Sequence, residues 1–181
     1  MSYMDKNIES IVMSYEDIVS KCTELGKKIT KEYKNKRPVL VGLLKGSMPF
    51  MAELMKHIDC DMEIDFLEVS SYNGASSTGL VTITKDIKTD IKGRDVIVVE
   101  DIVDTGYTLK EVMSLFKYKG ASSVEIACLL DKPSGRKTDL PTPKYVCNTI
   151  GPGFVVGFGL DYNQLYRNLN YIGILKKEVY S

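Results

Sequence analysis

The chain has 181 residues, 44% of them hydrophobic, and its 24 lysine and arginine residues balance 24 aspartate and glutamate residues. This length suits one well-packed domain, residues 1–181, and the balanced charge argues against a protein that attracts nucleic acid or an anionic membrane through its overall field. The first ten residues are polar and no segment is apolar over a membrane-spanning length, so we expect a cytoplasmic protein without a secretory signal.

Strand patterns alternate with helix patterns along most of the chain. Apolar residues at helical spacing predict helices over residues 14–32, 49–57 and 108–118. Short apolar runs predict strands over residues 38–44, 62–69, 81–84, 95–99, 124–130, 145–147 and 155–160. Residues 70–79 are small and polar, which favours a flexible loop. The alternation predicts an α/β fold in which helices flank a twisted parallel sheet.

Several residue types that often carry chemistry have no such role in this sequence. The cysteines Cys22, Cys60, Cys128 and Cys147 are scattered, which suits reduced core thiols better than disulfides or zinc ligands. The one histidine, His57, ends a predicted helix, where it meets the helix dipole favourably. The sequence contains neither G-x-G-x-x-G nor G-x-x-x-x-G-K-[ST], which argues against other common classes of nucleotide-binding protein.

The segment from Val96 to Thr108 combines an apolar strand, an acidic strand end, a short loop and the start of a helix. In open α/β sheets, ligands bind beyond the carboxyl ends of the strands, where the next helix offers free backbone N–H groups and the positive end of its dipole. Thr105 and Thr108 add hydroxyl donors, and Gly106 allows close backbone approach. These features predict a phosphate-binding site.

The acidic residues of this segment require a different ligand, because carboxylates repel phosphate. Glu100 and Asp101 suit the hydroxyl groups of a ribose, contacted directly or through magnesium and its waters. A phosphate and a sugar diol together describe a ribose 5-phosphate. The completeness of the pattern disfavours the alternative, in which Glu100, Asp101 and Asp104 are merely solvated acids after a strand.

This segment resembles the phosphoribosyl pyrophosphate signature of type I phosphoribosyltransferases: an apolar strand, Glu-Asp, two aliphatic residues, Asp-Thr-Gly, one residue and Thr. The resemblance implies a type I phosphoribosyltransferase fold with a flexible lid loop and a small hood over the active site, built from the N-terminal segment and about residues 145–181. It also implies that the phosphoribosyl group is bound by Glu100, Asp101, Asp104, Thr105, Gly106, Tyr107 and Thr108.

Further segments, from about Val39 to Leu175, are similar to bacterial hypoxanthine-guanine phosphoribosyltransferases. The similarity implies purine salvage: magnesium-dependent transfer of the 5-phosphoribosyl group from phosphoribosyl pyrophosphate to N9 of hypoxanthine or guanine, giving IMP or GMP and pyrophosphate. The preference between hypoxanthine and guanine stays open, and xanthine is a weaker possibility. Because the family commonly forms dimers and tetramers, we expect a homodimer or homotetramer.

The loop Leu44-Lys45-Gly46-Ser47 resembles the family's pyrophosphate loop. There, a cis peptide without proline turns backbone donors toward the leaving group, and in this chain it would join Leu44 to Lys45. The resemblance assigns pyrophosphate binding to Lys45, Gly46 and Ser47, and Arg167 matches the family's pyrophosphate-binding arginine. Without this context, Leu-Lys-Gly would indicate only an ordinary glycine turn.

Two segments resemble the family's purine-binding residues. Lys132 follows a predicted strand and would donate to the exocyclic oxygen of the base, which would select 6-oxopurines over adenine. Phe154 would stack on the base, and Val155 would read its edge through the backbone. Asp161 would lie at the purine site and also bind magnesium.

Asp104 is the candidate catalytic residue, because it could accept the proton from N7 of the purine as N9 bonds to the sugar. The residue type leaves open whether it accepts a proton or acts only as an electrostatic partner. The implied magnesium ligands are Glu100, Asp101 and Asp161. The implied lid residues, which would exclude water from the reacting centre, are Ser71 and Tyr72.

Two loops depart from the family pattern. Gly151-Pro152-Gly153 stands where the family often has Pro-Asp before the stacking residue, and Ser134-Gly135 stands where charged residues are common. The direction of the first loop therefore stays open, and we carry over no contacts from the second.

A rival hypothesis from another class is a regulatory protein that senses phosphoribosyl pyrophosphate and binds nucleic acid. The balanced charge and the lack of an added DNA-binding domain argue against it, as does the presence of Lys45, Lys132 and Arg167. We expect phosphoribosyl pyrophosphate and a 6-oxopurine as ligands, with neither nucleic acid nor membrane as a partner.

Overall fold

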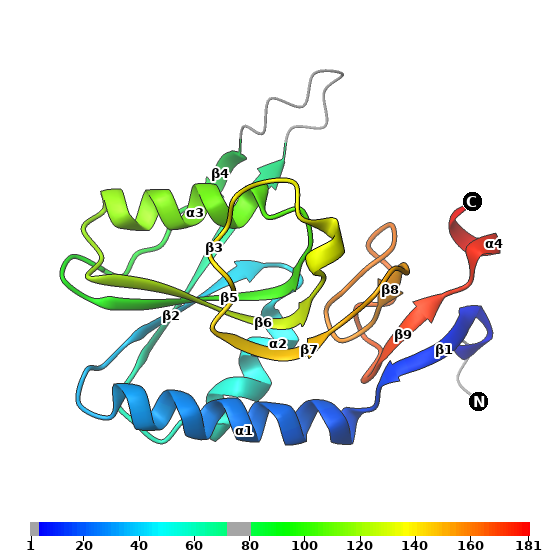
Figure 1. Ribbon diagram of the computed structural model, residues 1–181, viewed down its shortest axis with the longest axis horizontal. Coiled ribbons are helices and arrows are strands. Elements are labelled where there is room, and N and C mark those ends of the chain that lie inside the picture. Colours follow the sequence, from blue (N-terminus) through cyan, green and yellow to red (C-terminus); the bar gives the residue numbers. More distant parts are fainter. Residues whose placement is uncertain (1–3, 72–80) are drawn as a thin grey trace.

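The computed structural model describes residues 4–71 and 81–181. Its main element is a six-stranded sheet with the order β4-β3-β2-β5-β6-β7, a twisted layer between helices in Figure 1. The edge strand β4 (Val81–Lys85) pairs antiparallel with β3, and the other pairs are parallel. The parallel strands are β2 (Val39–Leu44), β3 (Glu63–Ser71), β5 (Asp95–Val103), β6 (Ser123–Asp131) and β7 (Tyr145–Thr149). The predicted α/β fold is confirmed.

Helices cover both faces of this sheet (Figure 1). The helices are α1 (Tyr15–Tyr33) and α2 (Met48–Leu54) on one face and α3 (Tyr107–Tyr118) on the other. Because successive side chains of a strand point to opposite faces, β5 serves both layers. Ile97 and Val99 belong to the core under α1 and α2, whereas Val96 and Val98 belong to the core under α3. This double burial explains the continuous apolar run.

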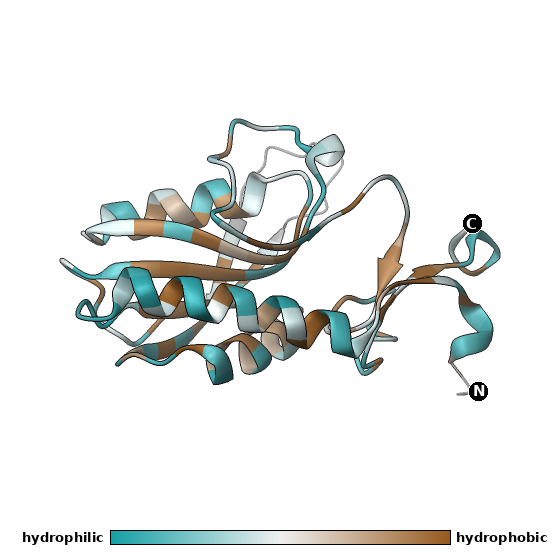
Figure 2. Ribbon diagram, turned by 60° about the horizontal axis from the view of Figure 1, so that its bottom comes forward, coloured by the Kyte–Doolittle hydropathy of each residue, from teal (hydrophilic) through white to brown (hydrophobic). Residues whose placement is uncertain are grey.

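The hydropathy of the ribbon follows the same division (Figure 2). The central strands are largely apolar, whereas α1 alternates between hydrophilic and hydrophobic turns along its length. Its buried residues, Ile18, Cys22, Leu25 and Ile29 among them, recur at helical spacing. Among the described residues, no helix is long and apolar enough to cross a membrane.

Local interactions set the ends of the first two helices. Ser14 is the N-cap of α1: its hydroxyl accepts a hydrogen bond from the backbone N–H of Asp17 at 3.1 Å, and the Asp17 carboxylate accepts one from the backbone N–H of Ser14 at 3.0 Å. α2 ends at Leu54 and passes into a 3₁₀ turn, η2 (Met55–His57). There His57 contacts the buried Glu53 at 3.1 Å, which is a structural use of this histidine.

A smaller antiparallel sheet brings the two ends of the chain together beside the carboxyl ends of β5 and β6 (Figure 1). Its strands, in spatial order, are β1 (Ile8–Met13), β9 (Ile172–Leu175) and β8 (Val155–Val156). A 3₁₀ turn, η1 (Asp5–Asn7), precedes β1, and a short helix, α4 (Lys177–Tyr180), follows β9. β7 belongs to the large sheet, so only residues from Val155 onward contribute the C-terminal strands of the small one.

Several strands extend past their predicted ends, and two of these extensions reach residues with predicted roles. β5 continues past Val99 to Val103, because Glu100, Ile102 and Val103 stay paired with β6. Ser70 and Ser71, predicted to begin the flexible loop, instead extend β3 by pairing with β4. The rest of that predicted loop, residues 72–79, lies outside the described residues.

The predicted strand over residues 155–160 is wrong beyond Val156. Gly157 and Gly159 have φ angles of 100° and 103°, and Phe158 has φ of 47°, so the backbone leaves the extended region. The result is a tight turn in which the backbone N–H of Gly157 donates to the carbonyl of Leu160 at 3.0 Å. This turn carries the chain from β8 to Asp161.

Candidate functional site

Two adjoining cavities lie at the carboxyl ends of β5 and β6. The first, which we call the loop cavity, has a volume of about 140 Å³ and is lined by Glu100, Asp101, Ile102, Val103, Asp104, Thr105, Gly106, Thr108 and Leu109. The second, the aromatic cavity, has a volume of about 230 Å³ and is lined by Asp101, Ile102, Asp104, Lys132, Gly153, Phe154, Val155, Leu160 and Asp161. Asp101, Ile102 and Asp104 line both. The structure therefore places the predicted phosphoribosyl residues beside the predicted purine residues.

The turn from β5 into α3 shapes the loop cavity. Gly106 has a φ of 86°, a left-handed conformation that favours glycine, and it caps α3, which begins at Tyr107. The first N–H groups of a helix have no partner within that helix, and the dipole makes this end positive. The first turn of α3 contains no acidic residue to oppose that charge. The loop cavity can therefore hold an anion such as a phosphate.

Arg136 ties this loop to the end of β6. Its Nη1 donates to the backbone carbonyl of Asp104 at 2.7 Å and also to that of Val103, and its Nη2 contacts the buried carboxylate of Asp131. The backbone N–H of Lys137 adds a hydrogen bond to the carbonyl of Thr105 at 3.0 Å. Arg136 is not among the site residues predicted from the sequence; an arginine shortly after a strand-end acid is the signal that could have found it.

Gly135 allows Asp104 to approach the same loop. A methyl group added at Gly135 would overlap the Asp104 carboxylate, whose Cγ would lie 2.8 Å from it. The Ser134-Gly135 loop, from which no family contact was carried over, thus sets the space available to Asp104, the candidate catalytic residue. Because the φ of Gly135 is not positive, it is the small size of glycine that matters at this position: a larger residue would displace the Asp104 carboxylate.

Glu100 and Asp101 form a pair of adjacent carboxyl groups at the wall of the loop cavity. Burial, and then the charge of Asp101, raise the pKa of Glu100 well above its ordinary value. Burial also raises the pKa of Asp101, although Arg167 contributes an opposing, favourable charge. When both carboxylates are ionised, a bound cation or hydroxyl donors would be needed to offset their burial and mutual repulsion.

Lys132 and Phe154 define the aromatic cavity. The Lys132 ammonium lies 3.9 Å from a carboxylate oxygen of Asp104 and donates to the carbonyl of Gly153 at 3.4 Å. Phe154 is 37% exposed, an unusual state for a phenylalanine in a folded chain, and it lines the cavity opposite β5. A flat apolar ring beside a fixed ammonium donor matches the face and the edge of a planar, polar heterocycle.

The loop after β2 supplies the next wall. The peptide bond between Leu44 and Lys45 is cis, as the sequence analysis expected. Lys45 is exposed, whereas Ser47 is completely buried and its hydroxyl has no hydrogen-bond partner among the described residues. A methyl group at Gly46 would overlap the carboxylate of Asp101, with its Cγ only 2.6 Å away. The loop therefore lies directly against the acidic pair.

Arg167 reaches the site from the turn after Asp161. Its guanidinium contacts the Asp161 carboxylate at 2.8 Å and donates to the carbonyl of Gly159 at 2.7 Å. Its buried Nε has no partner among the described residues. The predicted pyrophosphate-binding arginine is thus held beside the predicted magnesium ligand, with one donor unused.

The three predicted magnesium ligands do not form one cluster. Within residues 4–71 and 81–181, no three histidine, cysteine or acidic side chains gather closely enough to hold a metal ion by themselves. Glu100 and Asp101 are adjacent to each other, and Asp161 is paired with Arg167. The acidic pair still fits a hydrated magnesium ion, because two adjacent carboxyl groups at a cavity wall offer the oxygen ligands that magnesium prefers.

The predicted lid cannot be placed. Ser71 lies at the end of β3, and Tyr72 is outside the described residues. Their role as lid residues stays a prediction.

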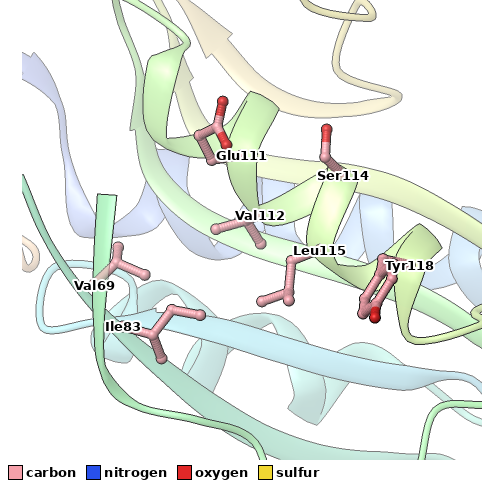
Figure 3. A pocket seen from close by; sticks show the side chains of 7 residues that line it. All are labelled: Val69, Ile83, Glu111, Val112, Ser114, Leu115 and Tyr118. Carbon is pink, nitrogen blue, oxygen red and sulfur yellow. The ribbon is translucent and has the colours of Figure 1, made fainter. Parts of the chain in front are cut away.

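A larger cavity elsewhere lacks the chemistry of this site. It has a volume of about 360 Å³ and lies between α3 and the β3–β4 pair, where Figure 3 shows the side chains of Val112 and Leu115 facing Val69 and Ile83. Glu111 is the one carboxylate among the described residues that line it. The reacting centre is therefore better placed at the two smaller cavities.

Comparison with known proteins agrees with this geometry. The family model described as "phosphoribosyl transferase domain" matches residues 12–163, a range that includes every residue named above as lining the two cavities. The chain belongs to the phosphoribosyltransferase family.

Within this family, the chain is similar to hypoxanthine-guanine phosphoribosyltransferases. That of Streptococcus pyogenes is 54% identical over 179 residues, 98% of this chain and 99% of the relative, and that of Streptococcus thermophilus is 55% identical with the same coverage. The crystal structure of a hypoxanthine phosphoribosyltransferase from Staphylococcus aureus has 50% identity and a TM-score of 0.96, covering 99% of this chain and 98% of that one. The resemblance inferred from the sequence is confirmed.

Proposed function

We propose that this protein is a purine-salvage enzyme that transfers the 5-phosphoribosyl group from phosphoribosyl pyrophosphate to N9 of hypoxanthine or guanine, releasing pyrophosphate. The observation that carries the proposal is the junction of the two cavities at Asp101 and Asp104. A ribose 5-phosphate in the loop cavity and a purine in the aromatic cavity would meet beside Asp104. Relatives more than half identical over nearly the whole chain carry the name of this activity.

The loop cavity accounts for the phosphoribosyl group. Its phosphate would accept hydrogen bonds from the start of α3, with Thr105, Gly106, Tyr107 and Thr108 around it. Glu100 and Asp101 would contact the ribose hydroxyls. The bonds from Arg136 to the carbonyls of Val103 and Asp104 would hold the loop in place around the phosphate.

The aromatic cavity accounts for the base. Phe154 would stack on the purine, Val155 would read its edge, and Lys132 would donate to its exocyclic oxygen. An amino group at that position, as in adenine, would face the Lys132 ammonium donor to donor and leave it without an acceptor. The cavity therefore favours hypoxanthine and guanine.

Asp104 would handle the proton of the base. As N9 forms its bond to the anomeric carbon and the bond from that carbon to pyrophosphate breaks with inversion, positive charge develops on the purine. The Asp104 carboxylate can accept the N7 proton or stabilise this charge, and the ammonium of Lys132 lies 3.9 Å from it, beside the position proposed for the base.

The leaving pyrophosphate would lie between the loop after β2 and Arg167. Lys45, Gly46 and Ser47 present an exposed ammonium, backbone groups and an unpartnered hydroxyl, and Arg167 has a free Nε donor. Glu100, Asp101 and Asp161 are the residues that would hold magnesium, whose charge would neutralise pyrophosphate oxygens when it is bound.

The protein's setting forms part of the same proposal. We place it in the cytoplasm, because its highly charged substrate does not cross membranes unaided. We also propose a homodimer or homotetramer, which sedimentation velocity would test. A structural relative from Trypanosoma cruzi, a hypoxanthine phosphoribosyl transferase of 34% identity and TM-score 0.92, has been studied for the role of its C-terminal region in its oligomeric state.

The direct test is pyrophosphate release by the purified protein with magnesium, phosphoribosyl pyrophosphate and hypoxanthine or guanine. The proposal predicts turnover with stoichiometric formation of IMP or GMP. Tight binding of phosphoribosyl pyrophosphate with no turnover of any base, together with salt-dependent binding to nucleic acid, would support the regulatory alternative instead.

A further inference from the structure

The ring of Phe154 rests on an aromatic side chain from the end of the chain. The rings of Phe154 and Tyr180 are stacked, with centroids 5.0 Å apart and planes 26° from parallel. Tyr162 closes the group: its ring meets Phe154 edge-on at 5.6 Å and lies 6.5 Å from Tyr180. Phe154 thus belongs to a cluster of three aromatic rings.

Only Phe154 of this cluster faces the aromatic cavity. Among the described residues that line the cavity, neither Tyr162 nor Tyr180 is included. A phenyl ring has two faces, and Tyr180 covers one of them. The other face is therefore the one available to a planar ligand in the cavity.

The backbone before Phe154 gives the ring little support. Gly151 is exposed and a methyl group added there would meet nothing within 4 Å, and Gly153 has a φ of 149°. After Phe154, its carbonyl accepts a hydrogen bond from the backbone N–H of Leu175 at 2.8 Å. Before Phe154, the carbonyl of Gly153 accepts a long hydrogen bond, 3.4 Å, from Lys132. These backbone contacts do not fix the plane of the Phe154 ring, which therefore depends on a neighbouring side chain.

Tyr180 is itself held by contacts to the small sheet. The backbone N–H of Lys176 donates to the carbonyl of Asn7 at 2.9 Å, which joins the start of α4 to the turn before β1. Tyr180 is half-buried and packs against the cluster that contains Val156 and Leu175. Because α4 spans only four residues, it has little stability of its own and depends on these tertiary contacts.

We propose that Tyr180 is a positioning residue for the purine: it supports the back of Phe154, so that the free face of that ring is held parallel to the bound base. This proposal rests on the proposed function for the identity of the ligand. The support from Tyr180 would compensate for the little support that the Gly151-Pro152-Gly153 segment gives to the Phe154 ring. It also assigns the C-terminal helix a part in base recognition.

The test compares ligands with and without a base. Titration calorimetry would measure the binding of GMP and of ribose 5-phosphate to the wild type, Tyr180→Ala and Tyr180→Phe. Tyr180→Ala should weaken GMP roughly three- to tenfold, the range expected for loss of an aromatic pair, and leave ribose 5-phosphate unchanged. Tyr180→Phe should restore GMP binding because it keeps the ring. Tyr118→Ala, a substitution at a 90% exposed tyrosine, is the matched control and should change neither affinity.

Each other outcome overturns the proposal. Unchanged GMP affinity in Tyr180→Ala would show that Phe154 needs no support, and equal weakening of both ligands, or no rescue by phenylalanine, would indicate a general structural role. Circular dichroism melting of each variant identifies unfolding, in which case Tyr180→Leu replaces Tyr180→Ala with the same expectations. Because binding is measured without turnover, an inactive wild type would contradict the proposed function and leave this test intact.

Discussion

The Lys132 ammonium lies 3.9 Å from the Asp104 carboxylate, across the wall shared by the two cavities. The residue proposed to recognise the exocyclic oxygen of the base and the residue proposed to receive its proton therefore act from neighbouring positions. Lys132 follows β6 and Asp104 follows β5, so the pairing of these parallel strands sets the distance.

Asp104→Asn should lower kcat by roughly a hundredfold or more and leave the affinity for phosphoribosyl pyrophosphate nearly unchanged, because asparagine keeps the shape but neither accepts a proton nor carries charge. Steady-state kinetics and equilibrium binding to the same preparation would measure the two effects. Unchanged turnover would refute the role of Asp104.

Gly46→Ala should reduce kcat/KM on the order of a hundredfold, because the added methyl group would displace the Asp101 carboxylate or the loop after β2. Gly151→Ala is the matched control: that position is exposed and has open space for a methyl group. Equal kinetics of the two variants would contradict the close approach of the loop to the acidic pair.

Arg136→Lys should raise KM for phosphoribosyl pyrophosphate more than KM for hypoxanthine. Lysine keeps the charge next to Asp131 but cannot contact that carboxylate and the carbonyls of Val103 and Asp104 together. Arg37→Lys, at a largely exposed arginine, provides the control. A rise confined to the hypoxanthine KM would argue against Arg136 as the support of the loop cavity.

Asp65 should make stability depend on acid pH. Burial alone would raise its pKa, but backbone N–H groups of Thr89, Phe66 and Lys88 outweigh burial and lower the pKa to about 2. A depressed carboxyl pKa stabilises the fold above the unfolded-state pKa, and this contribution is lost as the pH falls through the folded-state value.

Urea unfolding of wild type and Asp65→Asn across acid pH measures this contribution. The difference in the free energy of unfolding should be about 2 kcal/mol at pH 7 and should shrink as the pH falls from about 4 toward 2. Asp139→Asn, at an exposed position, controls for the removal of one charge. A difference that does not vary with pH would contradict the account.

The sequence was sufficient to predict the large sheet and the loop cavity, because both depend on local patterns. The apolar run before Glu100 and the Asp104-Thr105-Gly106 turn are contiguous, and the strand, turn and helix that they predict are present. The resemblance to the family added Lys132 and Phe154, which the structure brings to one cavity. Their roles in binding remain predictions.

The features that the sequence did not reveal depend on contacts between distant segments. β1 is a short, mostly exposed strand that pairs with β9 at the other end of the chain, and its apolar run is limited to three residues, Ile11 to Met13. Tyr180 is recognised only through its contact with Phe154, and Arg136 only through its bonds to the loop after β5. The end of β8 was misplaced because the φ angles of Gly157 and Gly159 break an otherwise strand-like apolar pattern.

The most direct test of the central claim is a magnesium-dependent assay with phosphoribosyl pyrophosphate and a panel of hypoxanthine, guanine, xanthine, adenine and uracil, run on the wild type and on Lys132→Met. The account predicts that the wild type converts hypoxanthine or guanine to the nucleotide and leaves adenine and uracil unreacted. Lys132→Met should lose roughly ten- to a hundredfold of its kcat/KM for the 6-oxopurine, as expected for loss of a charged hydrogen bond. Turnover of adenine as fast as hypoxanthine, or no nucleotide from any 6-oxopurine, would contradict it.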